Sequence, residues 1–374
     1  MPKPVPDIPP RKLYLELTTA CNMDCGMCIR RSWKTDGGTM SRRVFEAALA
    51  GAADLPTLRE VNFSGYGEPM LHPRFWDFLR RAKKAGLRAE FVTNAALLDD
   101  QAAARLVDLQ ADRVIVSLDS IASGQPDMLH PGSFAELAAR LRGLKELKER
   151  IQSARPEVCI EFVATRSNIH ELPALKNLSV ALGFSSILVT NLAPHTPDLA
   201  GEILYNHWST TVRAMAASPY TPVVDLPQLD VNPQTTRAIE RLRGMGTHIR
   251  VNGGEVWAAG PKCPFVTQGR LAVRFDGRVS PCLPLLHNHT VYFRSRRKAV
   301  ECFSVGDLHE QSLAAIWKSR PYRDLRRRLI RFEFSPCADC SGCDLREGNQ
   351  EDCSGGPPPR CGECLWAAGL LQCP

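Results

Sequence analysis

The cysteines of this chain gather in two groups. Three of the 14 lie within eight residues, at Cys21, Cys25 and Cys28, and ten fall between Cys263 and Cys373. A chain of 374 residues is long enough for two or three domains and does not need disulfides to replace a small core. Grouped thiols in such a chain indicate metal or redox chemistry. The remaining Cys159 lies in the apolar run EVCIEFVAT and is expected to be a buried core thiol.

Composition excludes several other classes of protein. Hydrophobic residues make up 44% of the chain and charged residues 23%, which is typical of a globular protein and not of a disordered or coiled-coil one. No apolar run reaches the length of about 18 residues that a membrane helix needs, and the N-terminal residues lack a signal-peptide core. A cytoplasmic protein is therefore expected. The net charge of +7 is scattered apart from residues 322–331, so neither nucleic acid nor membrane is expected as a partner.

Between residues 13 and 193 the chain alternates between two kinds of segment. Apolar runs typical of strands occur at 13–17, 60–64, 89–93, 113–118, 158–164 and 186–191, and segments with helical periodicity at 41–53, 74–85, 99–109, 134–150 and 171–182. Such alternation predicts an α/β fold of parallel strand–helix–strand units. We expect a partial (β/α)6 barrel of the TIM type, with its site at the carboxyl ends of the strands. Periodicity alone leaves an open doubly wound sheet as the alternative.

The first cysteine group follows the first expected strand directly. Three thiolates on a short loop can hold one small inorganic cluster, and on a four-iron cluster they leave one iron open. A closed zinc site would need a fourth ligand, and zinc remains the alternative. The spacing Cys21-x3-Cys25-x2-Cys28 resembles the radical S-adenosylmethionine (SAM) superfamily, although Met27 stands where that family usually has an aromatic residue. The resemblance implies a [4Fe-4S] cluster on these cysteines.

Further positions at successive strand ends match the same family. The resemblance implies SAM-binding roles for Tyr66, Gly67, Glu68 and Pro69 after the second strand, Thr93 and Asn94 after the third, Ser117 and Asp119 after the fourth, and Asn191 after the sixth. Glycines let backbone approach an ammonium closely and a carboxylate matches its charge. Each position alone could instead be a turn or a helix cap. The catalytic base is not identified.

The family's chemistry sets further expectations. The cluster would take one electron, from a ferredoxin- or flavodoxin-type donor, and cleave SAM to a 5′-deoxyadenosyl radical. That radical would remove a hydrogen atom from the substrate.

The C-terminal cysteine group resembles the SPASM extension found on many radical SAM enzymes. Cys263, thirteen residues, Gly277, four residues and Cys282 match its opening, and the later spacing departs from its usual form. The resemblance implies two auxiliary [4Fe-4S] clusters, with ligands drawn from Cys263, Cys282, Cys337, Cys340, Cys343, Cys353, Cys361, Cys364 and Cys373. Their partition between the clusters stays open, as does the role of Cys302. Zinc-ribbon or rubredoxin-like ligation by Cys337, Cys340, Cys361 and Cys364 is the alternative. His287 and His289 are expected on a surface loop.

These patterns divide the chain into four parts. An N-terminal extension covers residues 1–12, a radical SAM core 13–197, a connector 198–260 and a SPASM domain 261–374. Because the last part has few long apolar runs, metal ligation is expected to supply much of its folding energy.

The terminal segment DCSGGPPPRCGECLWAAGLLQCP resembles proteins associated with tungsten-containing aldehyde:ferredoxin oxidoreductases. This favours a maturase acting on a metalloenzyme client or its cofactor. A peptide-modifying enzyme that forms thioether or carbon–carbon crosslinks or formylglycine is the alternative, disfavoured because only twelve residues precede the first strand. A non-catalytic zinc or iron–sulfur scaffold is the second alternative, although a scaffold has no need of the Gly67-Glu68-Pro69 loop.

Overall fold

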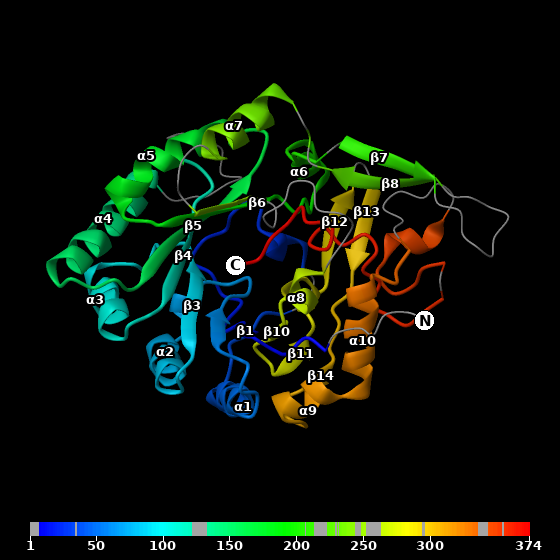
Figure 1. Cartoon of the computed structure of the whole chain (residues 1–374), viewed down its shortest axis with the longest axis horizontal. Helices are drawn as coiled ribbons and strands as arrows, with labels where there is room; N and C mark the ends of the chain where they lie inside the picture. The colour runs from blue at the N-terminus through cyan, green and yellow to red at the C-terminus, as the bar shows by residue number, and fades with distance from the viewer. Residues whose placement is uncertain are drawn as a thin grey trace.

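A curved parallel sheet with helices on its outer side forms the body of the protein (Figure 1). The computed structural model describes residues 7–33, 36–121, 133–205, 207–212, 223–228, 230, 232–243, 248–251, 263–293, 296–335, 343–353 and 355–374.

Six strands make up the core of the sheet. They are β1 (Lys12–Leu15), β2 (Glu60–Phe63), β3 (Arg88–Thr93), β4 (Arg113–Ser117), β5 (Glu157–Ala164) and β6 (Ser186–Asn191). Each pairs in parallel with the next in chain order. A doubly wound sheet would reverse its strand order at a switch point, whereas a barrel adds strands in one direction. The partial barrel is therefore confirmed, and the doubly wound alternative is wrong.

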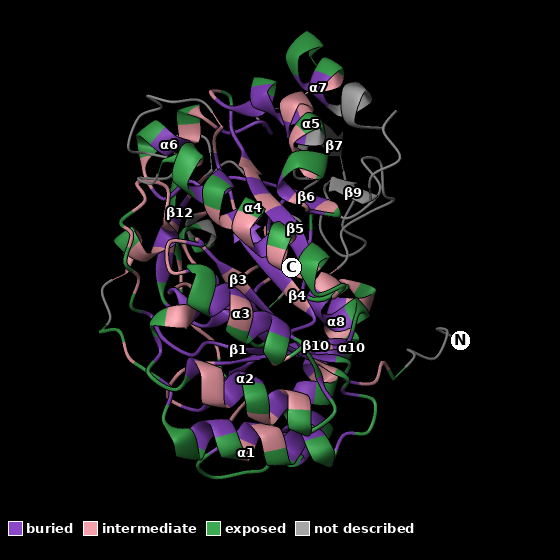
Figure 2. Ribbon diagram, turned by 90° about the vertical axis from the view of Figure 1, so that its left-hand side faces the viewer, coloured by how far each residue is buried: buried purple, intermediate pink, exposed green. Residues whose placement is uncertain are grey.

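Helices α1–α5 cover the outer, convex face of this sheet (Figure 1). They are α1 (Arg42–Ala53), α2 (Phe75–Lys84), α3 (Asp100–Asp108), α4 (Phe134–Arg150) and α5 (Leu172–Leu182), close to the ranges expected from periodicity. Ser41 and Asp99 cap the N-termini of α1 and α3 through their side-chain oxygens. The apolar faces pack tightly, as the Phe45 and Phe78 rings show by stacking at 3.9 Å. Figure 2 shows buried strands beneath helices whose outer faces are exposed.

The C-terminal part of the chain extends the same sheet. Strand β10 (Arg270–Val273) pairs in parallel with β1, and β11 (Arg278–Ser280) and β14 (Gly306–Asp307) follow it in antiparallel order. At the other edge β9 (His248–Val251) pairs with β6. Apolar residues of the C-terminal part join the main core, among them Leu271, Val279 and Leu313. Hydrophobic packing therefore supports this part beside any metal that it binds.

Shorter elements complete the described structure. Two antiparallel hairpins are formed by β7 (His207–Val212) with β8 (Val223–Gln228) and by β12 (His289–Phe293) with β13 (Arg296–Val300). The remaining α-helices are α6 (Pro197–Gly201), α7 (Pro233–Arg243), α8 (Pro264–Thr267), α9 (Leu313–Lys318) and α10 (Arg320–Arg331). Short 3-10 helices occur at Ile29–Ser32, Pro69–Leu71, Ile169–Glu171, Leu283–Leu285 and Asp344–Glu347. None of the described helices is both long and apolar enough to cross a membrane.

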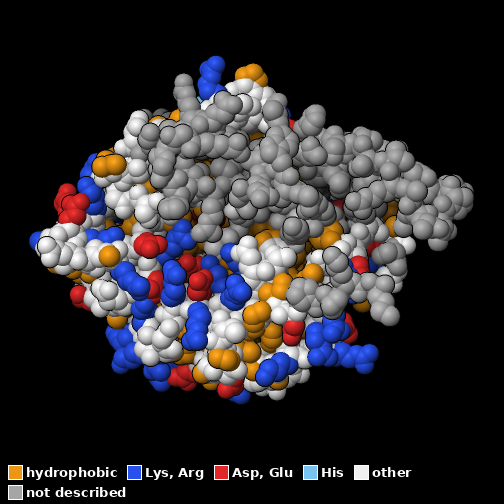
Figure 3. Space-filling model, viewed as in Figure 1, with side chains coloured by type: hydrophobic (Ala, Val, Ile, Leu, Met, Phe, Trp, Pro, Cys, Tyr) orange, Lys and Arg blue, Asp and Glu red, His pale blue; other side chains and the backbone are white. Residues whose placement is uncertain are grey.

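Charged side chains of both signs are interleaved over the described part of the face in Figure 3. Ion pairs on helix surfaces include Arg42 with Glu46 on α1 and Arg81 with Asp77 on α2. Exposed pairs of this kind contribute less than about 1 kcal/mol each.

The concave side of the sheet holds a second, smaller layer of side chains. Val114, Val116 and Ile160 belong to the main core under the helices, so the alternating residues face the barrel interior. There Ile115, Cys159 and Leu188 form a separate buried cluster. Cys159 is 1% exposed, which confirms it as a buried core thiol.

The segment 370–374 crosses this interior (Figure 1). Thr190 and Asn191 of β6 bond to Gln372 and Leu370, while Tyr14 of β1 and Arg270 of β10 bond to the main-chain oxygen of Pro374. The C-terminal segment therefore links both sides of the curved sheet.

Candidate functional site

The three N-terminal cysteines lie together on the loop after β1. Burial raises the pKa of Cys25 to about 12, and the neighbouring Asp119, Cys28 and Cys21 add to the shift. Asn94 donates from Nδ2 to Cys21 Sγ at 3.6 Å, and Arg30 donates from Nε to Cys28 Sγ at 3.3 Å. Such donors stabilise thiolates over thiols. The donor set therefore suits a metal cluster that binds thiolates.

Arg30 also holds the shape of this loop. Its guanidinium donates to the carbonyl of Thr19 at 2.9 Å and to that of Met23 at 3.1 Å. These carbonyls lie on both sides of Cys21, so one side chain braces the loop around the first thiol.

The glycine loop after β2 packs directly on the cysteine loop. A Cβ on Gly67 would lie 2.3 Å from the carbonyl oxygen of Thr18 and 2.6 Å from that of Ala20. The amide of Glu68 donates to the Ala20 carbonyl at 2.8 Å. Only glycine permits this approach, which sets residues 66–69 against the backbone that leads into Cys21.

The Glu68 carboxylate ties the β2 and β3 loops together. It is 2% exposed and accepts from the Asn94 amide at 2.9 Å, the Met70 amide at 3.0 Å and the Thr93 hydroxyl at 3.0 Å. Burial raises its pKa, and the hydrogen bonds from Asn94, Met70 and Thr93 oppose that shift. Thr93 ends β3 and Asn94 follows it, and the Glu68 carboxylate fixes both to the glycine loop.

Two carboxyl groups lie near the carboxyl end of β4: Asp119 follows that strand, and Glu161 of β5 pairs with its last residue, Ser117. Asp119 is 3% exposed and accepts from the Val163 amide at 3.4 Å. Burial raises the pKa of Asp119 to about 8 and that of Glu161 to about 7, and Glu161 adds to the shift of Asp119. Ser117 ends β4 and is half-buried. Sequence reasoning missed Glu161, although a charged residue within the apolar run of β5 was the available signal.

Asn191 is brought to the same end of the barrel but is covered. It is 4% exposed, and its amide donates to the carbonyl of Leu370 at 2.7 Å. The C-terminal segment therefore lies against Asn191, one of the residues expected to bind SAM.

A buried contact between a histidine and a carboxylate joins the cysteine loop to the C-terminal part. Glu16 and His287 are 0% and 1% exposed at their side chains and lie 2.8 Å apart. Trp33 stacks on His287 at 3.9 Å, and the Tyr66 hydroxyl donates to the Leu283 carbonyl at 3.2 Å. The expectation that His287 and His289 lie on a surface loop is wrong, because both side chains are buried.

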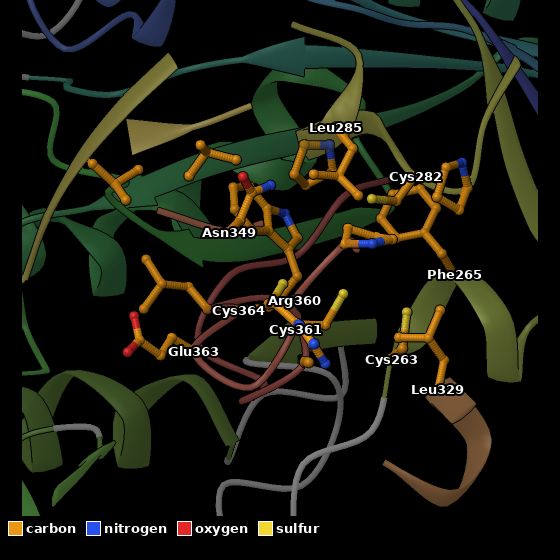
Figure 4. A pocket seen from close by; sticks show the side chains of 18 of the residues that line it. Cys263, Phe265, Cys282, Leu285, Leu329, Asn349, Arg360, Cys361, Glu363 and Cys364 are labelled. Atoms are coloured by element: carbon orange, nitrogen blue, oxygen red, sulfur yellow. The ribbon is translucent and has the colours of Figure 1, made fainter. Parts of the chain in front are cut away.

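Four C-terminal thiols line one cavity (Figure 4). Cys263 directly precedes α8, Cys282 follows β11, and Cys361 and Cys364 come from the terminal segment. The cavity has a volume of about 820 Å³ with its open mouth included, and it is lined mainly by apolar residues. Burial raises the pKa of all four thiols, that of Cys263 to about 12. Neighbouring thiols add to the rise at Cys263, Cys282 and Cys361.

The other C-terminal cysteines lie elsewhere or outside the described residues. Cys353 is exposed and its Sγ is 3.2 Å from the Ser335 hydroxyl, while Cys337 and Cys340 lie outside the described residues. Cys373 accepts from Trp366 Nε1 at 3.2 Å and does not line the four-thiol cavity. The amide of Cys302 donates to Asn288 at 2.7 Å.

Within the described ranges, no three Cys, His, Asp or Glu side chains converge on a point that would hold a single metal ion. The thiolates of a four-iron cluster each bind a different iron and so do not converge on one point.

Two family models match the chain. The radical SAM superfamily matches residues 15–175, and the iron–sulfur cluster-binding SPASM domain matches residues 263–344.

Curated relatives cover nearly the whole chain. The tungsten-containing aldehyde ferredoxin oxidoreductase cofactor-modifying protein of Pyrococcus furiosus is 31% identical over 97% of this chain and 96% of its own length. The PqqA peptide cyclase of Gluconobacter oxydans is 26% identical over 92% of this chain and 86% of its own.

Among solved structures, Streptococcus suis SuiB bound to its precursor peptide SuiA superposes with a TM-score of 0.60 at 14% identity, covering 89% of this chain and 70% of that one. At this identity the likeness concerns the fold.

Proposed function

The chain belongs to the radical SAM superfamily and carries a C-terminal SPASM domain, and on this premise we propose that it is a maturase acting on a tungsten-type oxidoreductase or its cofactor. It is an enzyme that uses a [4Fe-4S] cluster and SAM, with iron–sulfur chemistry in its SPASM domain as well. The observation that carries the substrate assignment is similarity over 97% of the chain to a cofactor-modifying protein.

The ligands of the active-site cluster are proposed to be Cys21, Cys25 and Cys28. When bound, the cluster and SAM together supply a 5′-deoxyadenosyl radical that removes a hydrogen atom from the substrate. The protein binds and orients these groups. Arg30 and Asn94 donate to the thiols, and Gly67 lets the SAM-binding loop lie against the cysteine loop.

The remaining SAM contacts are proposed along the strand ends. Backbone groups of Tyr66, Gly67, Glu68 and Pro69 would hold the methionine part, with Thr93 and Asn94 beside it. Ser117 and Asp119 would hold the ribose. The Asn191 amide donates to the Leu370 carbonyl, which lies between it and the proposed place of adenine. Its proposed role is therefore to position the C-terminal segment that borders the site.

The auxiliary ligands are proposed to fall into two sets of four. The first set is Cys263, Cys282, Cys361 and Cys364, because these thiols line one cavity. The second is Cys337, Cys340, Cys343 and Cys353, which are close together in sequence. Cys302 and Cys373 are then left outside both sets. We keep the proposed domain limits at 13–197 for the core and 261–374 for the SPASM domain.

The electron donor is proposed to be a ferredoxin- or flavodoxin-type protein, and the location the cytoplasm, where thiols remain reduced for cluster assembly. A protein or peptide as substrate agrees with both groups of relatives. Peptide modification is the second candidate, supported by whole-chain similarity to a peptide cyclase.

The test compares two substrates under anaerobic conditions. The reconstituted protein is incubated with SAM and a reductant, either with a tungsten oxidoreductase purified from cells that lack the maturase or with a precursor peptide. We expect the oxidoreductase to raise 5′-deoxyadenosine formation. The cofactor released from it afterwards should have a changed mass. Stimulation by the peptide alone would favour the second candidate, and stimulation by neither would overturn both.

A further inference from the structure

A buried lysine stands in the wall of the four-thiol cavity. Lys298 of β13 is 6% exposed and forms an ion pair with Glu363, which lies between Cys361 and Cys364 in sequence. Arg296 supports the same carboxylate at 3.5 Å. Figure 4 shows Glu363 beside Cys364 at the cavity. Placing an ammonium out of water costs several kcal/mol unless partners compensate, so its place beside four thiols calls for a reason.

Lys298 lines the same cavity as the four thiols, together with its partner Glu363. An ammonium has three N–H donors. Glu363 is its sole partner within the described residues, which leaves further donors for sulfur in the cavity.

A fixed positive charge in a dry site favours the more negative of two redox states. A cluster on four thiolates becomes more negative by one unit when it accepts an electron. Charge and hydrogen bonds at the sulfurs are among the factors that set cluster potentials.

We propose that Lys298 raises the reduction potential of the auxiliary cluster held by Cys263, Cys282, Cys361 and Cys364, by donating to its sulfurs from within the cavity wall. Glu363 holds the ammonium in place, and Arg296 contacts the same carboxylate. This inference rests on the proposed ligand set and deepens it. A cluster that is easier to reduce is suited to accept one electron from a substrate radical. The radical loses a proton in the same conversion to product.

The experiment is an EPR-monitored redox titration of the reconstituted full-length protein. Lys298→Met removes the charge and keeps the apolar stem, and Lys298→Arg keeps the charge. Glu363→Gln removes the counter-charge and leaves the ammonium. Lys84→Met makes the same chemical change on the exposed surface of α2 and serves as the matched control.

We expect Lys298→Met to lower the potential of one auxiliary cluster by at least 59 mV, a tenfold change in its one-electron reduction equilibrium. Glu363→Gln should shift the same potential upward, and Lys298→Arg and Lys84→Met should leave it near the wild-type value. Equal potentials in all five proteins would overturn the proposal, as would a downward shift in Glu363→Gln. If Lys298→Met fails to assemble the cluster, the sign of the Glu363→Gln shift decides.

The readout separates this inference from the proposed function. Full iron content and a SAM-dependent signal with unmoved auxiliary potentials would refute the role of Lys298 alone. If the reconstituted wild-type protein contains no auxiliary iron, the proposed ligand set is refuted instead.

Discussion

Replacing Gly67 by alanine should separate the SAM-binding loop from the cysteine loop. The added Cβ would lie 2.3 Å from the Thr18 oxygen, 2.6 Å from the Ala20 oxygen and 2.7 Å from the Thr19 carbonyl carbon. All three are backbone atoms, which cannot rotate away. The two loops must therefore move apart by about 1 Å to reach ordinary van der Waals contact.

That movement breaks the hydrogen bond from the Glu68 amide to the Ala20 carbonyl, now 2.8 Å long. Because Glu68 is 2% exposed, its amide would lose a partner out of reach of water. A buried donor left unpaired costs about 1–3 kcal/mol. If SAM must draw the loops together again on binding, the same cost weakens its affinity by about 5- to 150-fold.

Anaerobic equilibrium dialysis with radiolabelled SAM measures this affinity, and iron analysis confirms that the cluster is present. Gly201→Ala is the matched control, because nothing lies within 4 Å of its added Cβ. The reasoning is refuted if Gly67→Ala with full iron content binds SAM within twofold of wild type, or if Gly201→Ala weakens binding equally.

Three further substitutions test other parts of the structure. Glu161→Gln should stabilise the SAM-free protein at pH 8 and not at pH 4. Burial raises the pKa of the Glu161 carboxyl from 4.5 to about 7 in the folded state. The wild-type free energy of unfolding therefore falls by about 3 kcal/mol as the pH rises through that range. Thermal unfolding at both pH values checks this, and an equal gain at pH 4 would contradict it. Cys159→Ala should leave iron and sulfide content unchanged and cost about 1 kcal/mol of unfolding free energy, since it removes a buried sulfur packed on Ile115 and Leu188; loss of iron would make it a ligand. Asn191→Ala should speed amide hydrogen exchange in residues 365–374, because it removes the bond to the Leu370 carbonyl; unchanged exchange there would mean that other contacts hold the segment.

Local patterns in the sequence were sufficient for the core of the fold. Strands such as Arg113–Ser117 and helices such as Phe75–Lys84 carry their own apolar periodicity, so their positions follow from short windows of residues. The alternation of these elements then favours parallel pairing in chain order. The structure has that order from β1 to β6.

Contacts between segments far apart in the chain leave no comparable pattern in short windows of sequence. The pairing of Lys12 with Arg270 joins strands that are far apart in the chain. Burial of His287 against Glu16 depends on that pairing. The sequence around His287 alone therefore predicted a surface loop. Likewise Cys361 and Cys364 share a cavity with Cys263 only because the terminal segment folds back across the barrel. The spacing of the cysteines along the chain gives their number, but it does not show which of them share a cluster.

The most direct test of the account is EPR of the reconstituted, reduced protein with and without SAM, comparing wild type with the Cys21→Ala, Cys25→Ala, Cys28→Ala triple variant. We expect SAM to change one cluster signal in the wild type. The triple variant should lose that response and 5′-deoxyadenosine formation while keeping the auxiliary signals. A SAM-dependent signal that survives in the variant, or zinc in place of iron in the wild type, would contradict the assignment of these three cysteines.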